Sequence, residues 1–182
     1  SDISAGAVAS SQEIMDKIWN LSKDFGGNLS DYTVWLLERS MKTLGIRVKA
    51  QQRNAKRLAK FLNRHTAIKT VYYPGLKTNE YHGLAKIQMK GFGAMMSFEL
   101  TDEYNAEAFL KALELIKPSM SLAGVESTML LPSKTSHALL SDSDRFSQGI
   151  TDQLIRFSVG IENKSDLIND IEQAISASHS KR

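Results

Sequence analysis

Cysteine is absent from this sequence of 182 residues. Its absence excludes disulfide bonds, thiolate nucleophiles and cysteine-based metal sites. Long apolar runs are missing too, because no stretch approaches the roughly 18 apolar residues that a membrane-spanning helix needs. The opening residues 1–11 have neither the basic segment nor the apolar segment of a secretory signal. We therefore expect a cytoplasmic protein that has no membrane partner.

Motifs for metal binding and for common hydrolytic chemistry are also missing. The histidines lie far apart and without the spacing of metal ligands; they are His65, His82, His137 and His179. His137 follows Ser136, but no Gly-x-Ser-x-Gly motif accompanies them, so acyl-transfer chemistry is not indicated. Residues 91–93 (Gly-Phe-Gly) are too short to cradle a phosphate and predict a turn. We expect no bound metal.

Positive charge is concentrated in one segment although the net charge is only +3. Residues 31–65 contain nine Lys or Arg residues against two acids. A basic helix of this kind can bind nucleic acid. Aromatic and glycine residues are few in this segment and do not alternate with the charges, so a solvated helix face without a nucleic-acid partner is the better interpretation.

The same segment carries the clearest periodicity in the sequence. Side chains recur in steps of three and four residues, at Val34, Leu37, Met41, Leu44, Val48, Gln51, Ala55, Leu58 and Leu62. This pattern predicts one long amphipathic helix over residues 31–65, capped by Ser30 or Asp31, with Gly45 as a possible bend. Only Gln51 interrupts the apolar stripe. A helix of roughly 50 Å, at 1.5 Å per residue, suits a connection between domains or a contact with another subunit.

The rest of the chain divides around this helix. Residues 1–11 suggest a short buried strand and residues 11–19 a helix, so residues 1–30 are interpreted as the remnant of a domain that begins upstream. Residues 66–182 alternate strands and helices, with strands expected at 67–73, 94–100, 119–131 and 154–159 and helices capped by Asn105, Ser141 and Ser165. We predict an α+β domain whose mainly antiparallel sheet has helices on one face.

Arg156 is the most informative residue of this domain. Strand alternation places Ile155 and Phe157 on one face and Arg156 with Ser158 on the other. A partly buried guanidinium needs a partner, and its planar fork suits a carboxylate held by two hydrogen bonds. That carboxylate belongs either to an acidic side chain of the protein or to a ligand, and the pattern alone leaves both open.

Taken together, the segments resemble the Cys/Met-metabolism (transsulfuration) family of pyridoxal-phosphate enzymes, which includes cystathionine γ-synthase and the cystathionine lyases. The resemblance extends almost from end to end, through SDISAGAV, GGNLSDYTVWLLERSMKTLGIRV, VYYPGL, QMKGFGAMMSFEL, SLAGVES, PSKTSH and GITDQLIRFSVGIEN. It implies a fold-type-I enzyme whose cofactor, pyridoxal 5'-phosphate, is bound by a preceding N-terminal domain. The Schiff-base lysine would lie just before Ser1, so the chain alone is expected to be inactive.

The resemblance also implies roles for four residues. Arg156 matches the arginine that binds the α-carboxylate of an amino-acid substrate, and Ser121 matches the serine beside that carboxylate. Ser136 matches a position that lines the side-chain pocket. Met120 stands where many cystathionine-handling relatives have Glu, which argues against a simple transfer of their specificity. The resemblance further implies a homo-oligomer, a homotetramer in the parent enzyme.

Two other functions compete with this interpretation. The long helix over residues 31–65 would serve equally in an oligomerisation or interaction module. Its basic face would serve in a nucleic-acid-binding module, which the lack of interleaved aromatics disfavours.

Overall fold

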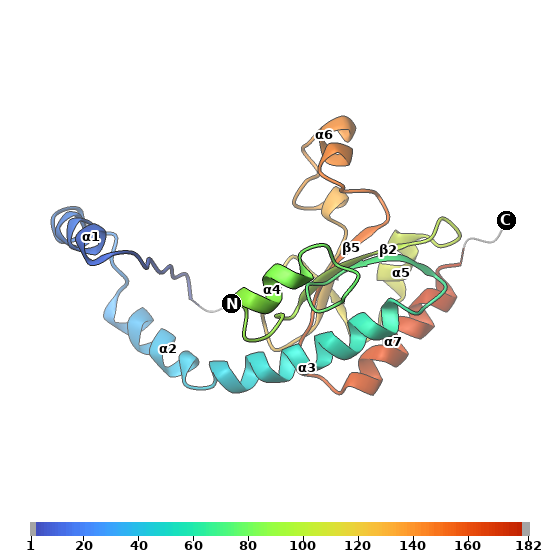
Figure 1. Ribbon diagram of the computed structural model, residues 1–182, viewed down its shortest axis with the longest axis horizontal. Helices are drawn as coiled ribbons and strands as arrows, with labels where there is room; N and C mark the ends of the chain where they lie inside the picture. Colours follow the sequence, from blue (N-terminus) through green and yellow to red (C-terminus); the bar gives the residue numbers. More distant parts are fainter. Residues whose placement is uncertain (1–2, 180–182) are drawn as a thin grey trace. The chain divides into compact units, whose positions relative to one another are not determined.

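The computed structural model describes residues 3–179, and the chain forms two compact units, residues 1–45 and residues 46–182 (Figure 1). The first unit contains α1 (Gln12–Phe25) and α2 (Asp31–Met41). Gly26 ends α1 with a φ of 79°, in the left-handed region that favours glycine. The hydroxyl of Ser30 caps α2 by accepting a hydrogen bond from the Thr33 amide at 3.3 Å, as the sequence predicts.

The second unit takes up the remaining elements. They are α3 (Leu44–Leu62, which begins at the junction), β1 (Ile68–Tyr72), α4 (His82–Gln88), β2 (Met95–Leu100), α5 (Ala106–Ala112), β3 (Lys117–Pro118), β4 (Thr128–Leu130), η1 (Pro132–Lys134), α6 (Asp142–Ser147), β5 (Leu154–Ser158) and α7 (Lys164–Ala177). The strands form one sheet in the order β1-β2-β5-β4-β3. Its pairs are antiparallel except β3 with β4, which confirms the predicted mainly antiparallel sheet.

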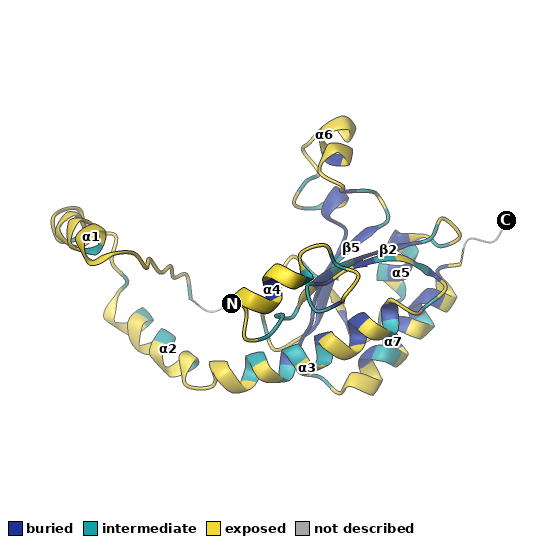
Figure 2. Ribbon diagram, viewed as in Figure 1, coloured by how far each residue is buried: buried dark blue, intermediate teal, exposed yellow. Residues whose placement is uncertain are grey.

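One hydrophobic core joins this sheet to three helices (Figure 2). Ile155 and Phe157 of β5 are fully buried in it, together with Leu58 of α3, Phe109 of α5 and Ile171 of α7. Burial of side chains of this size stabilises the fold by about 1.5–3 kcal/mol each. The α+β class and the packing of these helices against one side of the sheet are thus confirmed.

The predicted long helix is wrong in one respect, because residues 31–65 form two helices and not one. The turn at Lys42 and Thr43 separates α2 from α3, two residues before Gly45. The hydroxyl of Thr43 donates to the Ser40 carbonyl at 3.4 Å, and such local bonds compete with the regular helical pattern. Gly45, which has the lowest helix propensity of the non-proline residues, weakens the same turn.

The two halves of the apolar stripe accordingly differ in burial. Its C-terminal half lies in the core of the second unit, where Leu58 and Leu62 are fully buried. Its N-terminal half stays exposed within the first unit, where Val34 and Met41 each retain about half of their surface. The boundary between the two compact units does not coincide with the predicted division into residues 1–30, 31–65 and 66–182. The roles assigned to these three segments remain predictions.

Three smaller predictions also need correction. The predicted buried strand at residues 1–11 is wrong over its described part, because residues 3–11 form no strand and are almost entirely exposed. Residues 119–127 are a loop, and the strands of this region shorten to β3 and β4. Asn163, not Ser165, caps α7, since its side chain accepts from the Ser165 amide at 2.8 Å.

In the part of the chain that the structure describes, no helix combines the length and the apolar character needed to cross a membrane.

Candidate functional site

Arg156 lies in the middle of the central strand β5, on the face opposite the core. Ser97 of β2 and Leu130 of β4 are its partners across the two neighbouring strands. Ile155 and Phe157 on either side of it point into the core and are fully buried. The strand therefore holds the backbone of Arg156 rigidly while its side chain leaves the sheet on the other face.

The guanidinium of Arg156 is only partly satisfied by the protein. Its Nη2 donates to the carbonyl of Met120 at 2.9 Å and to the carbonyl of Ser121 at 3.2 Å. Its Nε is buried and has no hydrogen-bond partner. Among the described residues, no Asp or Glu lies within ion-pairing distance of it. A buried donor without a partner costs about 1–3 kcal/mol, so the free N–H groups favour an anionic ligand at this position.

The loop over residues 119–127 contains the two carbonyls that accept hydrogen bonds from Arg156. The Ser121 carbonyl also accepts from the Thr128 hydroxyl at 2.7 Å, and the Ser121 amide donates to the Ser119 hydroxyl at 3.2 Å. The Ala123 amide donates to the hydroxyl of Ser158 on β5 at 2.8 Å. Ala123 has a φ of 61°, a left-handed conformation that costs an alanine about 1–2 kcal/mol. These bonds hold the loop in a strained but defined shape beside Arg156.

Two polar side chains of α3 form hydrogen bonds with the loop of residues 119–127 and with the loop after β5. Gln51, which is buried, donates from Nε2 to the carbonyl of Gly124 at 2.6 Å. Asn54 donates from Nδ2 to the carbonyls of Gly160 and Glu162, at 3.1 and 2.8 Å. The helix thus fixes both the loop that bonds Arg156 and the loop that follows β5.

The carboxylate of Glu162 ties these two loops to each other. It accepts from the amide and from the hydroxyl of Ser127, and that hydroxyl accepts in turn from the Gly160 amide at 2.8 Å. A Cβ atom at Gly160 would collide with the Val125 carbonyl and the Ser127 amide. Only glycine allows this close approach.

These supporting residues were not predicted from the sequence. Gln51 carried a usable signal, because it is the one polar residue in the apolar stripe of the predicted helix. A buried amide at such a position needs a partner elsewhere in the fold. Asn54, Ser127 and Glu162 gave no comparable signal, since their hydrogen-bond partners lie more than 30 residues away in the sequence.

The predicted site residues are brought together only in part. Arg156, Met120 and Ser121 lie in direct contact, as described above. Ser136 is exposed, and its hydroxyl shares a hydrogen bond of 2.8 Å with Nδ1 of His137. No hydrogen bond joins Ser136 to the other three in the described chain, so its role remains a prediction.

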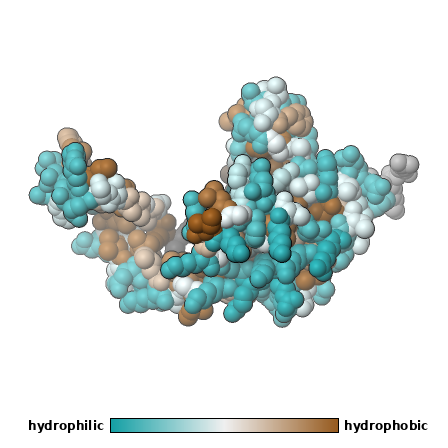
Figure 3. Space-filling model, in the orientation of Figure 1, coloured by the Kyte–Doolittle hydropathy of each residue, from teal (hydrophilic) through white to brown (hydrophobic). Residues whose placement is uncertain are grey.

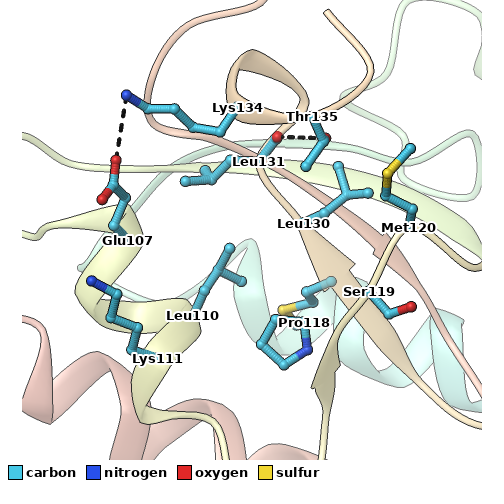
Figure 4. A pocket seen from close by; sticks show the side chains of 11 residues that line it. Glu107, Leu110, Lys111, Pro118, Ser119, Met120, Leu130, Leu131, Lys134 and Thr135 are labelled. Carbon is cyan, nitrogen blue, oxygen red and sulfur yellow. Dashed lines mark hydrogen bonds and ion pairs between the residues drawn. The ribbon is translucent and has the colours of Figure 1, made fainter. Parts of the chain in front are cut away.

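A pocket of 420 Å³ lies next to this site (Figure 4). Met120 belongs to both, because its carbonyl accepts from Arg156 and it also lines the pocket. Leu110, Leu130 and Leu131 give the pocket an apolar lining. Lys134 and Glu107, 3.4 Å apart, form an ion pair at its edge. Within residues 3–179, no group of three or more His, Cys, Asp or Glu side chains is placed to hold a metal.

Comparison with known proteins gives a consistent result. The chain is 43% identical over 176 residues to a cystathionine gamma-lyase of Bacillus subtilis (strain 168), covering 96% of this chain and 46% of that protein. It is 41% identical over 177 residues to an L-methionine gamma-lyase of Fusobacterium nucleatum subsp. polymorphum, with 96% and 45% covered. It therefore spans about half the length of these relatives.

Solved structures agree with the sequence relatives. Cystathionine gamma-lyase from Lactobacillus plantarum, complexed with L-serine, superposes with a TM-score of 0.88 at 37% identity, covering 94% of this chain and 45% of that one. Cystathionine gamma synthase from Xanthomonas oryzae pv. oryzae, in complex with cystathionine, gives a TM-score of 0.86 at 37% identity, with 93% and 44% covered. The family described as Cys/Met metabolism PLP-dependent enzymes matches residues 1–176. The chain belongs to the Cys/Met metabolism family of pyridoxal-phosphate-dependent enzymes.

Proposed function

We propose that this chain is the C-terminal part of a pyridoxal-phosphate-dependent lyase or synthase of sulfur amino-acid metabolism, and that Arg156 binds the α-carboxylate of its substrate. The observation that carries the proposal is the free guanidinium edge of Arg156. Nη2 is oriented by the carbonyls of Met120 and Ser121, while the buried Nε has no hydrogen-bond partner among residues 3–179. A carboxylate bound there would satisfy the orphaned donor and neutralise the charge.

The residues around Arg156 suit an amino-acid substrate better than the cofactor. The four residues that contact or pair with it, Ser97, Met120, Ser121 and Leu130, offer carbonyl and hydroxyl oxygens but no amine. A Schiff-base lysine is therefore not among them. Lys134, near the pocket, is paired with Glu107. The cofactor, which delocalises negative charge at the substrate Cα when bound, would be held by the part of the protein that precedes this chain.

In this proposal the chain contributes binding and orientation. Arg156 fixes the carboxylate end of the substrate, which determines the bond at Cα that is presented to the cofactor. Ser121 lies beside the same carboxylate. Met120 presents an apolar side chain at a position where a substrate with a distal ammonium group would need an acidic one. Ser136 lines the pocket for the substrate side chain. Because the chain brings no cofactor lysine, we expect it to be inactive alone.

Exchange of Arg156 for Lys in the whole protein tests the assignment. Lysine keeps the charge but loses the planar fork, so we expect KM for L-cystathionine, O-acetyl-L-homoserine or L-methionine, whichever is turned over, to rise about 10- to 100-fold. The dissociation constant of pyridoxal phosphate should change less than about twofold, because Arg156 binds the substrate and not the cofactor in this proposal. A twofold change corresponds to less than about 0.5 kcal/mol of binding free energy. Equal weakening of substrate and cofactor would show that Arg156 is structural.

A second role, assembly into a homo-oligomer, is supported by the first unit. Neither α1 nor α2 contains a buried residue. Large apolar side chains stay exposed there, Phe25 at 85%, Trp19 at 66% and Trp35 at 54%. Exposed apolar surface of this kind is typical of protein interfaces. We expect the whole protein to be a homotetramer in the cytoplasm, and light scattering that finds a monomer at all concentrations would contradict this.

A further inference from the structure

A groove of 660 Å³ on the second unit is surrounded by positive charge. It lies between the C-terminal half of α3, the turn that follows β1, and α4 with the segment after it. Six cationic side chains line it: Lys56, Lys60, Arg64, Lys77, Lys86 and Lys90. No acidic residue is among its lining residues. In Figure 3 hydrophilic side chains cover the surface over α3.

The cations of this groove are not neutralised by acidic side chains of the described residues. In the described part of the chain, none of the six takes part in an ion pair, whereas Lys69 and Lys134 elsewhere on the second unit are paired with Glu99 and Glu107. Lys56 and Lys60 lie four residues apart on α3, and Arg64 follows at the same interval in the turn after it. Like charges at this spacing destabilise a helix by about 0.2–0.5 kcal/mol per pair. The fold thus accepts a repulsion that a bound anion would remove.

Two neighbouring hollows extend the basic surface along α3. Lys60 lines both of them as well as the groove. Arg57 and Lys164 line both hollows and add two more cations without a carboxylate. The positive potential is therefore continuous over several cationic groups, which suits a ligand with clustered negative charges better than a single carboxylate.

The groove also has a partly aromatic wall. Nδ1 of His82 donates to the Pro74 carbonyl at 2.7 Å, and the His82 ring lies 5.4 Å from that of Phe92. Gly91 packs so closely on the Gln52 side chain that a Cβ atom there would collide with it. These contacts pack the segment after α4 against α3 and form this wall of the groove.

We propose that this groove binds a small molecule that carries several phosphate groups, at a site separate from that of Arg156. The lysines and Arg64 supply donors for phosphate oxygens from two sides, and the ring pair of His82 and Phe92 offers a surface for a base or sugar. None of the residues that line the groove is a hydrogen-bond partner of Arg156 or stands opposite it in a neighbouring strand. A ligand in this groove would therefore regulate the protein or be stored on it, and it would not take part in the reaction at the substrate.

Calorimetric titration of the whole protein, saturated with pyridoxal phosphate, tests this inference with ATP and inorganic triphosphate as probes. We expect binding of at least one probe in the micromolar range, weakening as salt is added. The double variant Lys60→Gln/Lys86→Gln should lose affinity about tenfold or more, because two charge-assisted hydrogen bonds are removed. The control Lys49→Gln/Lys117→Gln changes net charge equally at exposed positions that do not line the groove, and should lose less than about twofold.

The outcomes separate the alternatives. Tighter binding of ATP than of triphosphate assigns the groove to nucleotides, and equal binding assigns it to free polyphosphate; both support the proposal. Absence of binding by either probe at millimolar concentration overturns it. Equal losses in the groove and control variants also overturn it, because the attraction would then come from net charge alone. Binding of a single-stranded DNA oligonucleotide without binding of ATP would replace it by a nucleic-acid surface.

Discussion

The buried side-chain amide of Gln51 donates a hydrogen bond to the carbonyl of Gly124 at 2.6 Å, across 73 positions of sequence. Gly124 belongs to the loop whose carbonyls at Met120 and Ser121 orient Arg156. One polar residue on α3 therefore holds the loop that bonds the proposed carboxylate-binding residue, and we infer that it helps to orient the Arg156 side chain. Gln51 is a positioning residue.

Replacement of Gln51 by Leu should loosen this loop. The change keeps the volume but leaves the Gly124 carbonyl without its partner, at a cost of about 1–3 kcal/mol in the free energy of unfolding. In the whole protein we expect KM to rise severalfold with little change in cofactor affinity. Gln51→Glu, which has nearly the same shape as Gln, should have the same effect, because its carboxylate cannot donate to the carbonyl when ionised. An unchanged KM in both variants would remove Gln51 from the account.

Gly160→Ala should be strongly destabilising. The added Cβ would overlap the Val125 carbonyl and the Ser127 amide, so the two loops joined by Glu162 must separate. We expect a loss of about 2–4 kcal/mol in the free energy of unfolding, measured by urea denaturation. Gly83→Ala in α4 is the control, since no atom lies within 4 Å of its Cβ position. Alanine there should stabilise the helix by up to about 1 kcal/mol; equal losses at both glycines would contradict the described packing.

Asp170→Asn should weaken the connection of α7 to the segment after α5. The Asp170 carboxylate accepts from the amides of Glu114, Leu115 and Ile116, at 2.8, 3.1 and 2.8 Å. Hydrogen bonds to a charged group contribute about 1.5–3 kcal/mol, and an Asn amide cannot accept all three. We expect a loss of that order in the free energy of unfolding. The exposed Asp166→Asn, in the first turn of the same helix, should cost less than about 1 kcal/mol.

Tyr73 should make stability depend on pH in the alkaline range. Burial raises the pKa of its hydroxyl from 10.0 to about 12, and this hydroxyl donates to the Gly93 carbonyl at 3.1 Å. A raised pKa in the folded state means that the stabilisation is complete below pH 10 and is lost as the pH rises toward 12. The wild type should therefore lose more stability between pH 10 and 12 than Tyr73→Phe, as measured by thermal unfolding. Parallel losses in the two proteins would show that Tyr73 titrates normally.

Local patterns predicted the elements of the second unit well. Alternation in β5 separated the core residues Ile155 and Phe157 from Arg156, and the structure confirms that arrangement. Asn105 and Ser141 cap their helices as predicted, by accepting from the amides of Ala108 and Asp144. Such features depend on residues within a few positions of each other, which a sequence displays directly.

The misses come from interactions that local patterns do not contain. The stripe from Val34 to Leu62 is continuous in the sequence, yet only its second half meets a core, and the turn at Thr43 divides it. Asn163 and Ser165 both suit a helix cap, and the structure selects Asn163. For the candidate site, the sequence pointed to Arg156 and its loop, while Gln51, Asn54 and Glu162 depend on contacts between distant segments.

The most direct test compares two ligands that differ only in the α-carboxylate. L-Methionine and its decarboxylated analogue, 3-(methylthio)propylamine, are titrated against the whole protein and against Arg156→Lys. If Arg156 binds the carboxylate, the wild type should prefer methionine by about 10- to 100-fold, and the variant should lose most of that preference. If the variant discriminates as well as the wild type, another group binds the carboxylate and the central claim is wrong.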